Sequence, residues 1–237
     1  MTAAEWRKAL GELVRASAQS PEYARFYSIR LTKARAGIYI TQLGLYIRHR
    51  RDCWMFVSGN CPDMAVKQDI LGHEWEEMVQ DEYSDIGHLI LVVEQAKAVG
   101  LSAEDVLNAQ PLPLTRAALY AYGWLTRHRP WQEGLAALMV TEMANDNRLL
   151  EDLGGGLSLR TGRKWVEDLG LSWEQVPNSR VHAQADEKHG ELFLPALEAH
   201  VAEGQVGAVL EAARQSLELR ELTYRGISEA MEALPGA

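Results

Sequence analysis

The stretch His182-Ala-Gln-Ala-Asp186-Glu-Lys-His189 places two imidazoles and a carboxylate among good helix formers. The three polar residues stand at positions i, i+4 and i+7, so on an α-helix the second and third lie within about 40° of the first. Nitrogen and oxygen ligands of this kind suit iron, manganese or zinc. The alternative is a polar helix face whose histidines make ordinary hydrogen bonds. The pattern predicts a helix over about 178–203 that presents one metal-binding face.

The rest of the chain also has the composition of helices. Period-two alternation of β-branched residues is absent, and Ala, Leu, Glu, Gln and Arg dominate. Proline and glycine mark the expected breaks, for example at Ser20-Pro21, where the residue before a proline disfavours helical geometry. Other expected helices cover about 64–98 and 131–153. We expect one all-α domain over residues 1–237, with about eight to ten helices.

A second group of potential ligands lies between His73 and His88. Glu77, Asp81 and His88 stand at i, i+4 and i+11, and they fall within about 40° of one line if the helix over 64–98 is continuous. His73 extends the same stripe by one turn. Most acidic residues of this segment must face solvent, because carboxylates are rarely buried unless they are paired or bind a metal.

Gly87 is a weak point of that helix. If the helix breaks there, Glu82 could replace Glu77 as a ligand. The sequence alone leaves open whether Glu77, Asp81 or Glu82 completes this half of a site.

Glu142 interrupts an apolar run from Leu135 to Met143 in the middle of an expected helix. Burying a lone carboxylate is costly unless a cation or hydrogen-bond donors compensate it. A buried Arg or Lys would serve, and a metal ion would serve equally well. Glu142 is therefore a third candidate ligand.

Composition and charge exclude several classes of protein. The 237 residues are 47% apolar and carry a net charge of −9, which argues against a nucleic acid or an anionic membrane as a partner. The basic run at Arg48, Arg50 and Arg51 is better explained by a solvated helix end than by a phosphate-binding groove.

The chain also shows no sign of export or membrane insertion. No stretch approaches about 20 consecutive apolar residues, and the first ten residues lack the apolar region of a signal peptide. Cys53 and Cys61 are expected to be reduced thiols, although one disulfide is the alternative. These features predict a cytoplasmic protein.

Together the three motifs resemble the haem-oxygenase-like di-iron oxidases and oxygenases. That family has a Glu and a His, then a buried Glu in an apolar helix, then His-x-x-x-Asp-x-x-His. The last motif matches closely from His182 to His189, and Glu142 matches in character. The first pair departs from the pattern, because His73 stands where the family usually has Asn, and His88 follows Glu77 at eleven residues rather than seven to ten.

The resemblance implies a haem-oxygenase-like helical bundle, a homodimer and a site for two iron ions that activates O₂. One iron would be held by Glu77, His88 and Glu142, and the second by His182, Asp186, His189 and the same Glu142. Asp81 would be an additional ligand or a proton relay. The implied activity is oxidation of a small amino-acid-like or carboxylic-acid substrate in biosynthesis, by N-oxygenation, desaturation or carbon–carbon cleavage.

Substrate-binding residues are harder to identify from the sequence. Aromatic residues at helical spacing are more typical of a core, but six could line a pocket: Tyr23, Tyr27, Tyr39, Tyr46, Trp75 and Trp124. Four arginines could pair with a substrate carboxylate: Arg30, Arg35, Arg48 and Arg180.

Three other functions are compatible with the same fold. A thiamine-degrading hydrolase would need a nucleophilic Cys, and both cysteines lie outside the Glu142 helix. A cofactor-free oxidase of the quinone-biosynthesis type would use its histidines for acid–base chemistry. The polar stripe could also belong to a non-catalytic ligand-binding protein. Haem binding is disfavoured, because no histidine precedes His49 to act as the axial ligand of an N-terminal helix.

Overall fold

The computed structural model describes residues 1–234, apart from the side chains of residues 185–188. This part of the chain forms twelve α-helices and three short 3-10 helices, and it contains no strand. The α-helices are α1 (Ala3–Ala18), α2 (Pro21–Ser28), α3 (Lys33–Asn60), α4 (Met64–Met78), α5 (His88–Lys97), α6 (Ala103–Leu107), α7 (Pro113–His128), α8 (Trp131–Met143), α9 (Leu157–Leu169), α10 (Pro177–His189), α11 (Leu194–His200) and α12 (Val206–Glu232). The 3-10 helices are η1 (Glu151–Leu153), η2 (Trp173–Gln175) and η3 (Glu203–Gln205).

Side-chain caps begin helices at the breaks that the sequence predicts. The Ser20 hydroxyl accepts a hydrogen bond from the backbone N–H of Tyr23, and Pro21 occupies the first position of α2. Ser102 and Asp105 form a reciprocal capping box at the beginning of α6. These local contacts satisfy backbone donors that have no partner inside the helix.

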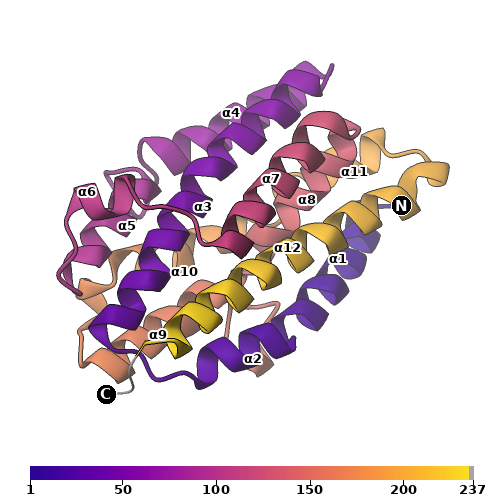
Figure 1. Ribbon diagram of the computed structural model, residues 1–237. Coiled ribbons are helices and arrows are strands. Elements are labelled where there is room, and N and C mark those ends of the chain that lie inside the picture. The colour runs from indigo at the N-terminus through magenta and orange to yellow at the C-terminus, as the bar shows by residue number, and fades with distance from the viewer. Residues whose placement is uncertain (235–237) are drawn as a thin grey trace.

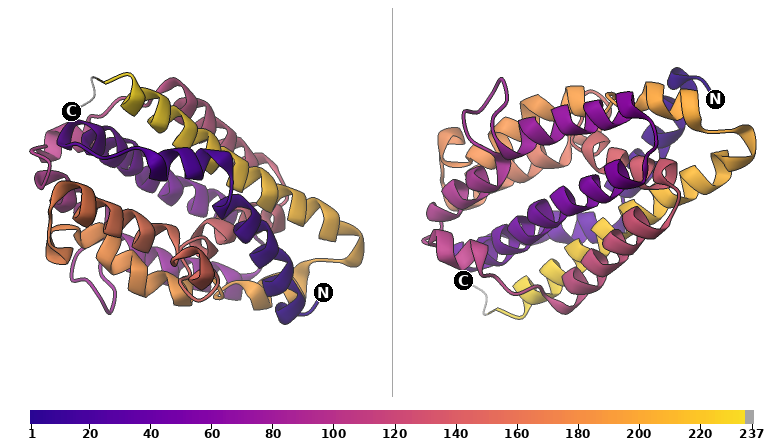
Figure 2. Two further views of the ribbon diagram at one scale, coloured as in Figure 1. Left: turned by 90° about the horizontal axis from the view of Figure 1, so that it is seen from below. Right: turned by 90° about the horizontal axis from the view of Figure 1, so that it is seen from above.

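Helix α8 lies inside the bundle, where it packs against α3, α7, α12, α1 and α10 (Figures 1 and 2). All its residues from Glu133 to Met143 are buried. Gly134 allows a close approach to α3, because a Cβ atom there would lie 2.8 Å from Cγ2 of Val57. This central position explains why Glu142, near the end of α8, is only 5% exposed.

The single helix expected over 64–98 is wrong. Helix α4 ends at Met78 and α5 begins at His88, and residues 79–87 form a loop between them. Gly87 is required at the end of this loop, because a Cβ atom there would lie 2.2 Å from the carbonyl oxygen of Met78. The break turns the chain so that Asp81 no longer follows Glu77 along one helix face.

Two other expected helices are also shorter than predicted. The helix over 178–203 divides into α10 and α11, with Pro195 in the first turn of α11. The helix over 131–153 ends at Met143, before the η1 turn. The divisions of the helices expected over 64–98 and 178–203 add the two α-helices by which the described part of the chain, with twelve, exceeds ten.

The interpretation of the basic run as a solvated helix end is also wrong. The run lies within α3, which continues to Asn60, and only Arg48 is exposed. Arg50 is 5% exposed, and the Arg51 side chain is mostly buried. Both side chains point toward the candidate site described below.

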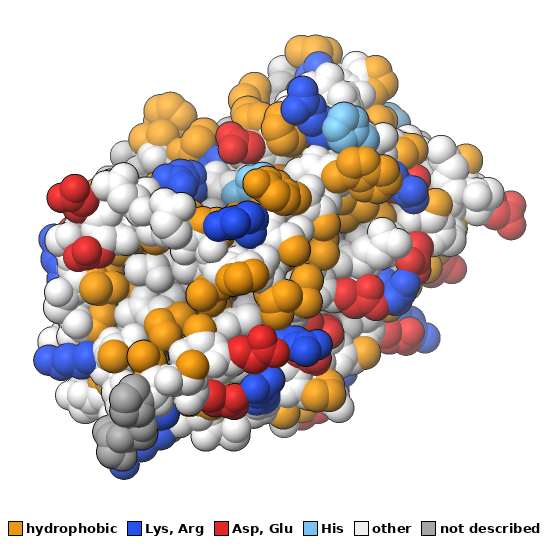
Figure 3. Space-filling model, viewed as in Figure 1, with side chains coloured by type: hydrophobic (Ala, Val, Ile, Leu, Met, Phe, Trp, Pro, Cys, Tyr) orange, Lys and Arg blue, Asp and Glu red, His pale blue; other side chains and the backbone are white. Residues whose placement is uncertain are grey.

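On the face shown in Figure 3, acidic and basic side chains are interspersed among apolar ones. Within residues 1–234, no helix has the length and apolar character that crossing a membrane requires. Cys53 and Cys61 are free and buried.

Candidate metal centre

Four helices bring six potential ligands together in the interior. The ligands are His73 and Glu77 of α4, His88 at the beginning of α5, Glu142 of α8, and His182 and His189 of α10. All six side chains are buried. The side chain of Asp186, the remaining predicted ligand, lies outside the described residues.

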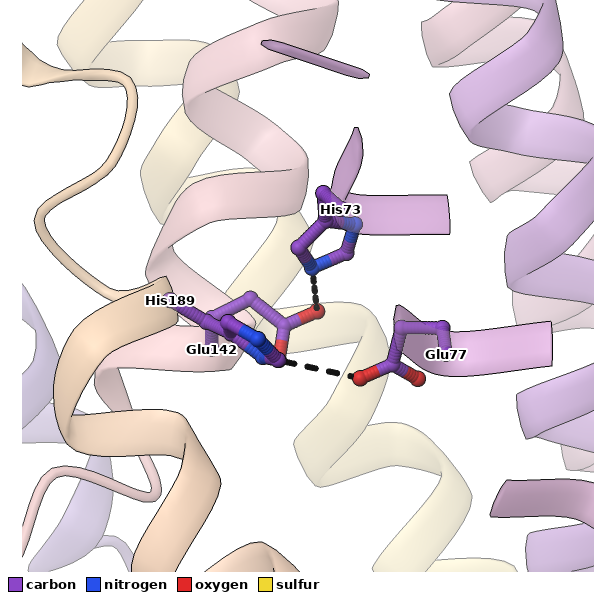
Figure 4. A group of neighbouring side chains, drawn as sticks. All are labelled: His73, Glu77, Glu142 and His189. Atoms are coloured by element: carbon purple, nitrogen blue, oxygen red, sulfur yellow. Dashed lines mark ion pairs between the residues drawn. The ribbon is translucent and has the colours of Figure 1, made fainter. Parts of the chain in front are cut away.

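His73, Glu77, Glu142 and His189 form one group, the four-residue cluster (Figure 4). Each residue offers a ligand atom within 4.8 Å of the others. Nε2 of His73 lies 3.8 Å from Oε1 of Glu142, and Nδ1 of His189 lies 3.6 Å from Oε1 of Glu77. Two imidazoles and two carboxylates at this spacing can bind one metal ion.

Glu77, His88 and His182 form a second group, the three-residue cluster, within the same 4.8 Å limit. Nδ1 of His88 lies 3.0 Å from Oε1 of Glu77. The rings of His88 and His182 are 4.3 Å apart at their centres. Glu77 belongs to both clusters, so one carboxylate could serve two neighbouring ions.

Each of the four imidazoles has one ring nitrogen within hydrogen-bond distance of an oxygen that can only accept. These oxygens are Oε1 of Glu74 for His73 (3.1 Å), Oδ2 of Asp81 for His88 (3.0 Å), the Asn178 carbonyl for His182 (2.9 Å) and Oε2 of Glu76 for His189 (2.7 Å). In a neutral ring the hydrogen-bonded nitrogen then carries the proton, and the other nitrogen presents a lone pair. Metal-binding histidines are oriented in this way, so the residues present fit a metal ion.

Asp81 lies on the loop between α4 and α5, behind His88 and outside both clusters. Its carboxylate contacts Nε2 of His88 and accepts a hydrogen bond from the backbone of Tyr83. Burial raises the pKa of Asp81, but its hydrogen bonds to His88 and the loop backbone lower the pKa by a larger amount. The net shift of the pKa is therefore downward. This geometry suits orientation of the imidazole better than direct ligation. Glu82, the other alternative, is exposed.

The ligands divide differently from the arrangement implied by the family resemblance. The sequence interpretation shared Glu142 between the ions and placed His182 with His189. Among the described side chains, Glu77 is the residue common to both clusters, and the two histidines of α10 fall in different clusters. Seven residues of α-helix span about 10 Å, which is too far for two side chains on one face to meet easily at one ion.

The buried Arg50 and the mostly buried Arg51 compensate the carboxylates. Arg50 lies 2.5 Å from Oε1 of Glu142, and Arg51 lies 2.9 Å from Glu74 and 3.0 Å from Glu77. Burial raises the pKa of Glu142, but the Arg50 guanidinium and the His73 and His189 imidazoles together outweigh burial and lower the pKa to about 2. Burial likewise opposes ionisation of Glu77, whereas His88 and Arg51 keep its pKa well below the ordinary value.

A cavity adjoins both clusters. Its lining includes Glu77, Glu142 and His182 on one side and Tyr46 and Arg220 on the other. It is partly open to solvent and leaves about 40 Å³ for the centres of water-sized molecules. Because it touches ligands of both groups, it is the natural place for a substrate.

The predicted substrate contacts are only partly placed there. Tyr39 and Tyr46 line the cavity, whereas Trp75 and Trp124 are 57% and 54% exposed. The interpretation of these two tryptophans as pocket residues is therefore wrong.

None of the four predicted arginines lines the cavity, although Arg50, Arg51 and Arg220 do. A signal for Arg220 existed in the sequence. It stands at i+3 from Leu217, with Tyr224 at i+7, and so lies within the apolar stripe of its helix.

A helical bundle with buried histidine and carboxylate clusters beside a cavity is an arrangement that can bind metal ions. The sequence profile of one family, described as an iron-containing redox enzyme, matches residues 38–221. The chain belongs to this family of iron-containing redox enzymes. No curated protein matched the sequence.

Solved structures support the fold. A domain of unknown function with a heme oxygenase-like fold, from Shewanella denitrificans, has a TM-score of 0.74 at 18% identity, over 98% of this chain and 94% of that one. A CADD-like protein of unknown function from Nostoc punctiforme has a TM-score of 0.75 at 13% identity, over 96% of this chain and 98% of that one. The predicted all-α, haem-oxygenase-like fold is confirmed.

Proposed function

We propose that this protein is a non-haem di-iron oxidase or oxygenase that uses O₂ to oxidise a small amino-acid-like or carboxylic-acid substrate. The supporting observation is the pair of adjacent ligand clusters that share Glu77. A carboxylate common to two ligand sets is suited to holding two ions close together. The ligand set of imidazoles and carboxylates is one that iron accepts.

The four-residue cluster would hold one iron and the three-residue cluster the other, and we propose Asp186 as a further ligand. When bound, the two irons supply the electrons that O₂ activation requires. The chain's own residues keep the imidazoles oriented, since Glu74, Asp81, Asn178 and Glu76 fix one nitrogen of each ring.

The arginines and the cavity provide the remaining functions. Arg50 and Arg51 keep the buried carboxylates ionised, which a cation-binding site needs. The contact between His88 and Asp81 offers a place where a proton can be held beside the cluster. The surrounding helices enclose the cavity in part, which would limit the access of bulk water to a bound substrate.

A hydrolase that uses a cysteine nucleophile finds little support. Burial raises the pKa of the Cys53 thiol, so the reactive thiolate is disfavoured. Neither Cys53 nor Cys61 is among the residues that line the cavity.

The proposal is tested by anaerobic reconstitution with Fe(II), followed by metal analysis and exposure to O₂. We expect two irons per chain and a transient absorption band in the visible range. His182→Ala and Glu142→Ala should each bind less iron. The matched controls are His128→Ala, an exposed histidine on α7, and Glu133→Ala, a buried acid on α8 paired with Arg129.

Failure of the wild-type protein to bind iron would refute the proposal. Iron uptake that is unchanged in both ligand variants would refute it as well. Oxygen consumption that persists after complete removal of metal would favour the cofactor-free oxidase instead.

A further inference from the structure

Arg220 is a buried cation that has no carboxylate partner among the described side chains. Its side chain lies in the middle of α12 and the residue is 8% exposed. Its one hydrogen bond within the described part of the chain runs from Nη1 to the carbonyl oxygen of Thr141, at 2.9 Å. No carboxylate among the described residues lies within ion-pair distance of it, whereas Arg50 and Arg51 both have such partners.

The surroundings of Arg220 are phenol rings rather than acids. Its guanidinium carbon lies 5.5 Å from the centre of the Tyr46 ring, and Tyr39 and Tyr224 line the same space. A buried guanidinium without an anion is costly, because ring contacts recover only part of its lost hydration. Bidentate binding of a carboxylate would supply the missing partner.

The position of Arg220 connects this unpaired charge to the metal centre. Arg220 lines the cavity that also touches Glu77, Glu142 and His182, and it lines a smaller apolar pocket with Leu43 and Ile227. The guanidinium carbon of Arg50, which contacts Glu142, also lies 5.5 Å from the Tyr46 ring. The guanidinium carbons of Arg220 and Arg50 are therefore no more than twice 5.5 Å apart.

We propose that Arg220 binds the carboxylate of the substrate, and that the substrate is a small monocarboxylate with an apolar or aromatic body. The tyrosines and Leu43 contact that body, and the end remote from the carboxylate faces Glu77, Glu142 and His182. The orientation of the substrate toward the irons rests on the proposed function. Recognition of the carboxylate by Arg220 does not require it.

The test compares 3-phenylpropanoate with its uncharged analogue 3-phenylpropanamide by calorimetric titration of the full-length protein. The titrations use both chelator-treated and iron-loaded protein. A charge-assisted contact should make the acid bind roughly 10- to 100-fold more tightly than the amide, also without iron. Equal affinity of the wild-type protein for acid and amide would overturn the proposal.

Variants assign the preference to Arg220. Arg220→Gln should remove the preference for the acid, and Arg220→Lys should retain only part of it. Arg225→Gln, an exposed arginine on the same helix paired with Glu229, is the matched control and should bind both probes as the wild type does. An acid preference that is unchanged in Arg220→Gln would assign the anion to another cation and overturn the proposal.

Two further outcomes keep the proposals separate. If Arg220→Gln fails to fold, as judged by circular dichroism, the Arg220→Lys variant decides: weaker binding of the acid with unchanged binding of the amide supports the proposal, and unchanged binding of both refutes it. An acid preference in a protein that never binds iron would refute the di-iron function but not the carboxylate site. Iron binding without an acid preference would refute only the carboxylate site.

Discussion

The two ligand clusters are held in place by different means. The four-residue cluster is built on α4, α8 and α10, and its carboxylates are fixed by ion pairs with Arg50 and Arg51. The three-residue cluster depends on His88, the first residue of α5, and therefore on the loop of residues 79–87. Regular helices and buried ion pairs resist displacement better than a loop does. We infer that the three-residue cluster is the more easily disturbed of the two.

The largest effect is expected from Glu77→Gln, because Glu77 is common to both clusters. Removal of a hydrogen-bonding partner behind a metal ligand costs roughly 10- to 100-fold in metal affinity, and loss of a shared ligand should cost at least as much at each site. Metal analysis after anaerobic loading should therefore find little iron in either cluster. Asp69→Asn, an exposed acid on the same helix, is the control. Loss of only one iron in Glu77→Gln would show that the carboxylate is not shared.

Single-cluster variants should each remove one iron. His73→Gln alters only the four-residue cluster, and His88→Gln alters only the three-residue cluster. We expect about one iron per chain in each variant, with different Mössbauer spectra for the remaining ion. Identical spectra, or loss of both irons in either variant, would contradict the division into two clusters.

Gly87→Ala should disturb the three-residue cluster without touching a ligand. The added methyl group would lie 2.2 Å from the backbone oxygen of Met78, so the loop must shift. We expect a loss of roughly 3 kcal/mol in the free energy of unfolding and weaker binding of one iron only. Gly72→Ala, in the open interior of α4, should instead gain about 0.5–1 kcal/mol. Urea unfolding and metal titration measure both, and equal weakening of the two irons in Gly87→Ala would contradict the comparison.

The smallest effect concerns pH and the four-residue cluster. The pKa of Glu142 is lowered from 4.5 to about 2. Its ionised form therefore stabilises the fold fully above about pH 4.5, and this contribution is lost as the pH falls from there through about pH 2. In chelator-treated protein, the stability of the wild type relative to Glu142→Gln should fall by about 2 kcal/mol between about pH 5 and about pH 3. Urea unfolding at both pH values measures this difference. A difference that does not change with pH would mean that Arg50 does not hold Glu142 in its ionised form.

The sequence predicted the fold class and identified most of the residues that the structure brings together. The stripe on α10 was readable because His182 and His189 keep helical spacing, and Glu142 was readable because an acid within an apolar run requires a partner. Spacing along one helix does not reveal which side chains on other helices a residue will meet. The sharing of Glu77 and the separation of the two α10 histidines therefore required the structure.

Two other features were hidden for physical reasons. The loop at 79–87 depends on a backbone contact between Gly87 and Met78, and a glycine within a helical pattern does not show whether the chain will turn there. The roles of Arg50 and Arg220 were obscured because arginine is usually a surface residue. For both arginines, the useful sign in the sequence is their position, because the helix period predicts an apolar side chain there.

The pairing of Arg50 with Glu142 and of Arg51 with Glu77 has a consequence for the life of the protein in a cell. A zinc finger cannot fold until its metal arrives, because nothing else holds its ligands together. Here positive charges encoded in the chain itself offset the buried acids, so a newly made polypeptide can reach its folded form during iron scarcity. In the proposed di-iron protein, loading would then be a late step in maturation, in which the incoming ions displace the guanidinium groups from the carboxylates.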